Sequence, residues 1–182
     1  MVLSQQTYER VALEDPDGQW ELHHGRLREK PPMTWEHNDA MVLLGHFLLQ
    51  QLDRRQFRVR INAGRVRRSS QNVYIPDVLV VPTSYGDRLR DRSDLLEVFD
   101  DPLPLVVEIW SPSTGDYDVD AKIPEYQRRG DAEIWHIHPY ERTLTAWRRQ
   151  PDGSYKEATF HGGAVQPVAL PHVSIDLDAL FE

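Results

Sequence analysis

Two apolar segments of this 182-residue chain are each interrupted by a single carboxylate. Asp77 lies within the segment 73–81, and Glu108 lies within the segment 105–110. Such segments are typical of buried strands, and a buried strand normally excludes an unpaired charge. Both carboxylates therefore need a counter-charge, which a divalent metal ion supplies most simply. Lys122 follows soon after, and the three side chains together indicate metal-assisted hydrolysis of a phosphodiester.

Lys122 falls in the first turn of a helix that the sequence predicts from near Asp118. A cation in this place faces the positive end of the helix dipole, which costs roughly a few tenths of a kcal/mol. The cost is easier to understand if Lys122 meets an anion, because helix N-termini also attract phosphate. The alternative is a solvated surface lysine whose charge Asp118 and Asp120 offset, and spacing alone leaves both interpretations open.

Size and composition fit one domain over residues 1–182, with 40% hydrophobic and 27% charged residues. The chain has no cysteine, so any metal must bind to oxygen or imidazole ligands. No apolar stretch approaches the roughly 20 residues that span a bilayer. Residues 1–6 have neither the basic region nor the apolar core of a signal peptide. We therefore expect a cytoplasmic protein with no membrane partner.

Seven arginines fall within the segment 54–68, just before the first carboxylate strand. The net charge of −8 argues mildly against loose, non-specific binding of nucleic acid. The cluster itself is compatible with a phosphate-facing patch and equally with a solvated strand-and-turn surface that acids elsewhere balance. The candidate nucleic-acid-binding residues are Arg58, Arg60, Arg65 and Arg67.

The order of helices and strands predicts an α/β domain around a mixed sheet. A short amphipathic segment is expected over residues 7–13 and a tight hairpin around His24 and Gly25. The polar stretch 83–101 could hold a short helix over 95–99. A helix beginning near Thr34 is expected to bury one apolar stripe, which consists of Met41, Leu44, Gly45, Leu48 and Leu52.

The second half of the chain predicts one more helix and several strands. The helix is expected over residues 119–129, with Gly130 as its C-terminal cap. Strands are expected over 133–137 and 143–147, and a hairpin is expected around Gly153.

Several motifs occur together and in a fixed order along nearly the whole chain. They are Glu21-Leu22-x-x-Gly25-x-Leu27, Pro31-Pro32, His37, Ile75-Pro76-Asp77-Val78, Val106-Val107-Glu108-Ile109-Trp110-Ser111-Pro112-Ser113-Thr114, Asp118-x-x-x-Lys122-x-x-x-Tyr126, Gly130-Asp131-Ala132-Glu133-Ile134-Trp135 and Pro139. In this combination the chain resembles the putative restriction endonuclease branch of the PD-(D/E)XK nuclease superfamily. The resemblance implies a restriction-endonuclease-like mixed sheet flanked by helices.

The same resemblance implies a metal ion, usually Mg²⁺ or alternatively Mn²⁺, bound by Asp77 and Glu108. Glu21 could supply a further carboxylate ligand, or it could be an exposed acid of the hairpin. Lys122 would orient the attacking water or stabilise the charge that develops on the phosphate. The expected substrate is DNA, and a symmetric homodimer is expected because many such enzymes cut two strands.

The chain departs from the family pattern at two positions. In the parent superfamily the lysine lies two residues after the second acid, where this chain has Trp110. In the branch that the chain resembles, the role of this lysine passes to the following helix, where Lys122 lies. The second departure is His138, which replaces an aspartate that usually precedes the proline. We expect this change to be structural.

The remaining candidates allow a structural and a functional interpretation. His136 and His138 face one side of a strand and could begin a zinc site, although spacing places no third ligand. His37 either hydrogen-bonds into the site or caps local backbone, and Asp118 is expected to be a helix N-cap more than a metal ligand. A catalytically silent nucleic-acid-binding or regulatory protein with the same fold is the alternative to a metal-dependent DNA endonuclease.

Overall fold

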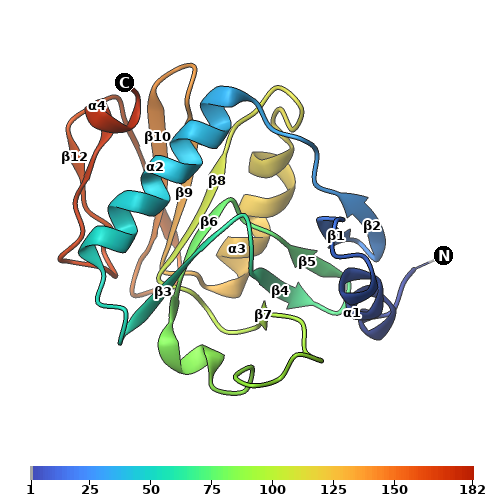
Figure 1. Cartoon of the computed structure of the whole chain (residues 1–182). Helices are drawn as coiled ribbons and strands as arrows, with labels where there is room; N and C mark the ends of the chain where they lie inside the picture. The colour runs from blue at the N-terminus through green and yellow to red at the C-terminus, as the bar shows by residue number, and fades with distance from the viewer. Residues whose placement is uncertain (1) are drawn as a thin grey trace.

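The computed structural model describes residues 2–182 and contains one large mixed sheet with helices on both faces (Figure 1). Neighbouring strands of this sheet are antiparallel except β8 and β9, which are parallel. In spatial order its strands are β11 (Tyr155–Phe160), β10 (Thr143–Arg149), β9 (Glu133–His138), β8 (Leu105–Ile109), β6 (Val78–Pro82) and β3 (Phe57–Ile61).

A smaller sheet lies beside it and carries the predicted hairpin. In spatial order it consists of β2 (Arg26–Glu29), β1 (Trp20–His23), β5 (Asn72–Tyr74), β4 (Arg65–Ser69) and β7 (Val98–Phe99). The turn between β1 and β2 has positive φ angles at both His24 and Gly25, as a two-residue hairpin turn requires. Near the C-terminus, β12 (Ala164–Val165) pairs with β13 (Ile175–Asp176).

The helices are α1 (Gln5–Glu14), α2 (Trp35–Gln51), α3 (Ile123–Arg129) and α4 (Leu177–Leu180). A short 3₁₀ turn, η1 (Thr83–Gly86), follows β6, and a π-helical turn, η2 (Asp118–Lys122), leads into α3. Within residues 2–182 no helix has both the length and the apolar character that a membrane crossing needs.

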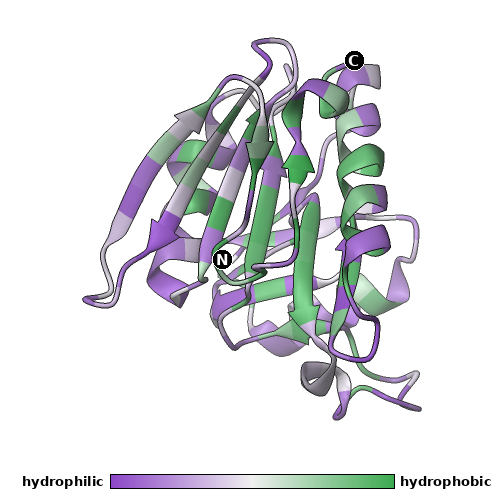
Figure 2. Ribbon diagram, turned by 90° about the vertical axis from the view of Figure 1, so that its left-hand side faces the viewer, coloured by the Kyte–Doolittle hydropathy of each residue, from purple (hydrophilic) through white to green (hydrophobic). Residues whose placement is uncertain are grey.

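Two apolar cores lie on opposite faces of the large sheet. Residues of α2 pack against one face, where Val78, Val107 and Trp135 point, and α3 packs against the other with Leu79 and Val106. In Figure 2 the hydrophobic colour is concentrated in the strands at the middle of the sheet.

The buried stripe of α2 is the predicted one, with Leu52 partly buried. A larger residue in place of Gly45 would force the Ile61 side chain on β3 to move, because a Cβ atom there would lie 2.2 Å from Ile61 Cδ1. The glycine thus lets the helix approach the sheet edge closely.

The chain departs from the sequence-based prediction in two segments. The short helix expected over residues 95–99 is wrong, because Val98 and Phe99 instead pair in parallel with β4 and are buried. The helix expected over 119–129 begins as a π-helical turn, in which the Ile123 N–H donates to the Asp118 carbonyl. Pro124 has no N–H to donate within the following turn, which favours this local change in hydrogen bonding.

A buried arginine fixes the end of α3 to the small sheet. Arg129 pairs with Asp131 at 3.0 Å, and its guanidinium also donates to the carbonyls of Arg67, Phe99 and Asp101. Replacing Arg129 by methionine would leave the buried Asp131 carboxylate and these carbonyls without their donor. We expect the free energy of unfolding to fall by about 3–5 kcal/mol, measured by urea denaturation. A loss below about 1 kcal/mol would contradict this role.

Candidate active site

Asp77 and Glu108 lie side by side on the face of the large sheet that α3 covers. Asp77 directly precedes β6, and Glu108 lies on β8. The antiparallel pairing of Val78 with Val107 brings the two carboxylates to neighbouring positions. Both side chains are buried, with at most 1% of the residue exposed. Residues 105–109 therefore form the expected buried strand, whereas the segment 73–81 divides between β5 of the small sheet and β6 of the large sheet, with Asp77 in the bend that joins them.

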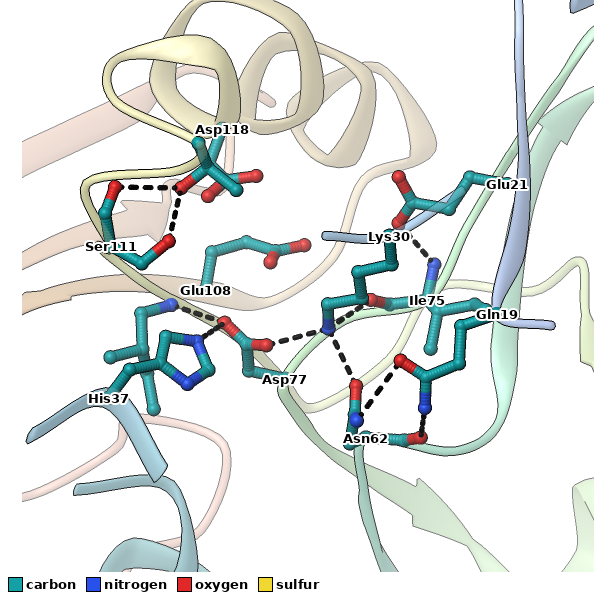
Figure 3. A network of polar contacts seen from close by, with 12 residues as sticks. Gln19, Glu21, Lys30, His37, Asn62, Ile75, Asp77, Glu108, Ser111 and Asp118 are labelled. Carbon is teal, nitrogen blue, oxygen red and sulfur yellow. Dashed lines mark hydrogen bonds and ion pairs between the residues drawn. The ribbon is translucent and has the colours of Figure 1, made fainter. Parts of the chain in front are cut away.

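Asp77 is held by three groups of the chain itself (Figure 3). Its Oδ1 lies 2.6 Å from Lys30 Nζ, and its Oδ2 accepts a 2.7 Å hydrogen bond from the Ile109 N–H. His37 Nε2 lies 3.1 Å from the same Oδ2. Burial alone would raise the pKa of the Asp77 carboxyl, but the Lys30 ammonium and His37 lower it below its ordinary value. Asp77 is therefore ionised. The position of His37 agrees with the interpretation in which it hydrogen-bonds into the site and does not cap local backbone.

Lys30 is the residue that sequence reasoning missed. Its ammonium is buried and donates to Asn62 Oδ1 at 2.8 Å and to the Ile75 carbonyl at 3.0 Å, besides Asp77. Figure 3 shows it reaching between Asp77 and Asn62, whose amide in turn bonds Gln19. Nothing local marks this lysine, because it lies in a proline-flanked connection and its partner is 47 residues away.

Lys122 lies in the same buried region and not in solvent. Its Nζ is 3.4 Å from Glu108 Oε1 and from Glu108 Oε2. Burial alone would lower the pKa of Lys122, but Glu108 and the nearby Glu21 and Asp118 raise it well above its ordinary value. Tyr126, one turn later on α3, donates a 2.5 Å hydrogen bond to Glu108 Oε1. The Lys-x-x-x-Tyr spacing thus aims both side chains at one carboxylate.

Glu21 and Asp118 complete the buried cluster. Glu21 lies on β1, where its Oε1 accepts from the Ile75 N–H at 2.9 Å and lies 2.9 Å from Lys122 Nζ. Glu21 is 1% exposed, so the alternative of an exposed hairpin acid is wrong. Asp118 Oδ1 is 3.3 Å from Lys122 Nζ, and its carboxylate does not cap the following turn, contrary to the N-cap prediction.

The cluster therefore holds four buried carboxylates and two buried lysines, so its acids exceed its bases by two. The chain has only three lysines, and this cluster contains two of them. Burial raises the pKa of Glu108 well above its ordinary value, and Asp118 and Asp77 add to the rise although Lys122 opposes it. The members of the cluster are Glu21, Lys30, Asp77, Glu108, Asp118 and Lys122.

With all four carboxyl groups ionised, this excess matches the charge of one divalent cation, and such a cation would favour the ionised form of Glu108 that burial disfavours. Between residues 2 and 182 no three His, Asp or Glu side chains form a ready-made ligand set. Mg²⁺ keeps several waters and takes as few as one or two protein carboxylates, so Asp77 and Glu108 fit it in number and kind. For zinc at His136 and His138 the third ligand is likewise missing in the described part of the chain.

The four predicted nucleic-acid-binding arginines lie on β3 and β4, and their charged ends bond outside the cluster. Arg60 forms a bidentate pair with Glu97, and Arg67 pairs with Asp100 and Glu9. Arg58 instead donates to the Thr83 hydroxyl, and Arg65 donates to the Tyr8 hydroxyl. Two of the four charges are therefore already matched by acids of the same chain.

The strands next to the cluster carry an imidazole and an aromatic pair. His136 is aligned with Glu108 in the parallel β8–β9 register, and its buried Nε2 has no hydrogen-bond partner among residues 2–182. Burial lowers the pKa of His136, so this ring is neutral at pH 7.

Trp110 stacks on His138 at 4.3 Å between ring centroids. His138 Nδ1 accepts the Glu141 N–H, which agrees with the expected structural role.

Comparisons with known proteins agree with this architecture. The family model Uma2, described as "Putative restriction endonuclease", matches residues 5–178. Among solved structures, a putative nuclease belonging to DUF820 from Anabaena variabilis ATCC 29413 superposes with a TM-score of 0.73. It is 20% identical, and the match covers 89% of each chain, which supports the predicted fold. Among curated proteins no sequence match is found.

Proposed function

The chain belongs to the Uma2 family of putative restriction endonucleases, and from this premise we propose that it is a metal-dependent endonuclease of DNA. Membership supports nuclease chemistry in general and a nucleic acid as substrate. The proposal adds that Mg²⁺ or Mn²⁺ is the cofactor and that DNA phosphodiester bonds are hydrolysed. A homodimer stays a prediction, based on the need to cut two strands.

The excess of two carboxylates in the buried cluster carries this proposal. A binding module has no use for four buried acids, because each costs several kcal/mol to desolvate unless it is paired. Two lysines compensate only half of these charges. A divalent cation at Asp77 and Glu108 would balance the remainder, and it would do so where a phosphate could complete its shell.

The residues of the chain would share the work of hydrolysis. A bound Mg²⁺ ion would supply an activated water and positive charge beside the scissile phosphate. Asp77 is held in one orientation by its three partners, and Tyr126 fixes one oxygen of Glu108. Lys122 keeps its proton and would place a compact positive charge where negative charge develops on the phosphate. Glu21 and Asp118 hold the ammonium in that position.

Metal binding can be tested without any cleavage assay. We expect calorimetric titration to show Mn²⁺ or Mg²⁺ binding to the wild-type protein, and at least about tenfold weaker binding to Asp77→Asn and Glu108→Gln, because each removes a charged ligand. Asp17→Asn is the matched control, since Asp17 is an exposed turn residue outside the cluster. Equal affinity in all four proteins would exclude a metal at this pair.

One observation favours the rival, a catalytically silent nucleic-acid-binding protein with this fold. Lys30 already gives Asp77 a counter-charge of its own, at 2.6 Å. A protein without metal chemistry would keep Asp77 ionised in this way. The same titration separates the two functions, because the rival requires no metal affinity at Asp77.

A further inference from the structure

One face of the β1–β2 hairpin points toward the buried cluster. In the antiparallel register Glu21 is opposite Arg28, and His23 is opposite Arg26. Directly opposed residues project from the same face of a sheet. Because the Glu21 carboxylate reaches Lys122, the face that carries Arg28 is the face of the site. The neighbouring Leu22 belongs to the apolar core on the opposite face.

Arg28 is held over this site by an aromatic ring. Its guanidinium carbon lies 3.4 Å from the centroid of the Tyr117 ring, and Tyr117 directly precedes Asp118 of the cluster. Stacking on the ring face fixes the plane of the guanidinium and leaves its N–H groups at the edge. Glu21 does not neutralise it, because that carboxylate bonds Lys122 and the Ile75 N–H.

Between residues 2 and 182 the Tyr117 hydroxyl has no hydrogen-bond acceptor and the Arg28 guanidinium has no carboxylate partner, although both side chains are at least partly buried. The Tyr117 hydroxyl is buried and has no hydrogen-bond partner among residues 2–182. Arg28 is half-buried and its charge acts on the Tyr117 hydroxyl, but no carboxylate pairs with its guanidinium in this part of the chain, whereas Arg60 and Arg67 are fully paired with acids. A fork of N–H donors without a carboxylate partner, beside a hydroxyl whose proton has no acceptor, is suited to an anion with several acceptor oxygens.

We propose that Arg28 and the Tyr117 hydroxyl form a binding subsite for a backbone phosphate adjacent to the scissile one. The inference rests on the proposed function and names the residues that position the substrate. Arg28 would bind two phosphate oxygens through its fork, and Tyr117 would donate to a third acceptor. Such contacts set the register of a nucleic acid and carry no sequence preference.

The test measures binding of a short fluorescent DNA duplex by anisotropy over a range of NaCl concentrations. All proteins carry Glu108→Gln, which prevents cleavage while Mg²⁺ is present. Adding Arg28→Gln should weaken binding about tenfold and reduce the salt slope by about one unit, because one phosphate contact is lost. Adding Tyr117→Phe should weaken binding about three- to tenfold with an unchanged slope.

Two further variants separate the loss of a phosphate contact from a general loss of charge and from poor folding. Arg54→Gln removes the same charge from an exposed turn, where Asp53 pairs with Arg55 and Arg54 itself has no acidic partner among residues 2–182, and it should change neither quantity. Arg28→Lys keeps the charge but not the fork, so it should retain the slope and lose affinity, even if Arg28→Gln folds poorly.

Unchanged affinity and slope in Arg28→Gln would overturn the subsite while leaving the nuclease proposal intact. Failure of the parent protein to bind any nucleic acid would overturn the proposed function and the subsite with it.

Discussion

Replacing Lys122 by methionine should slow DNA cleavage by about 100- to 1,000-fold, because the lost charge acts mainly in the transition state. The ammonium lies within 3.4 Å of both oxygens of Glu108 and is the shared cation of Glu21 and Asp118. Removing it also leaves three buried acids with less compensation, so a lower melting temperature is expected as well. The rate is therefore measured in single turnovers, well below that temperature.

Lys156→Met is the matched control, because Lys156 is the third lysine of the chain and is exposed on β11. It should cleave like the wild type. Lys122→Arg should rescue poorly, since a planar guanidinium cannot occupy the place of a compact ammonium. A Lys122→Met protein that cleaves at the wild-type rate would remove this residue from the mechanism.

Replacing Lys30 by methionine should lower the free energy of unfolding by about 3–5 kcal/mol at pH 7, because it leaves the Asp77 carboxylate buried without its main counter-charge. The methionine side chain fills a similar volume, so the loss reports the ion pair and its hydrogen bonds. Urea denaturation of the two proteins measures the difference. A loss smaller than about 1 kcal/mol would contradict the assignment of Lys30 as the partner of Asp77.

A double-mutant cycle with Asp77→Asn isolates the pair. The combined variant should recover part of the stability that Lys30→Met loses, because no unpaired charge remains. The free energy of unfolding should also depend on pH in the way that this ion pair requires.

The pKa of Asp77 is lowered from its ordinary 3.8, so the stabilisation by the Lys30–Asp77 pair is complete above that value. It is lost as the pH falls through the folded-state pKa. Lys30→Met should show a weaker loss in this acid range.

Local sequence patterns were sufficient for much of the fold. Apolar spacing predicted the buried stripe of α2, and the His24–Gly25 dipeptide predicted the first hairpin. The strand β7 was missed because Val98 and Phe99 form only two residues of strand, and their conformation depends on pairing with β4. The π-helical turn before α3 was missed because one proline shifts the hydrogen-bond pattern without altering the apolar spacing.

The site could be predicted from the sequence only where a charged residue interrupts an apolar segment. A carboxylate in an apolar strand requires compensation, which identified Asp77 and Glu108 and led to Lys122. Lys30 causes no such conflict in its own segment, so its pairing with Asp77 emerges only from the tertiary structure. The same holds for Glu97, whose pairing with Arg60 reduces the charge of the predicted arginine patch.

Cleavage of closed circular DNA tests the central claim most directly, because a circle has no ends and only an endonuclease can cut it. The wild-type protein with Mg²⁺ or Mn²⁺ should convert supercoiled circles to nicked or linear DNA, and a chelator should stop the reaction. Glu108→Gln, folded to the same extent by circular dichroism, should leave the circles intact. Equal nicking by wild type and Glu108→Gln, or no cleavage with either metal ion, would contradict the account.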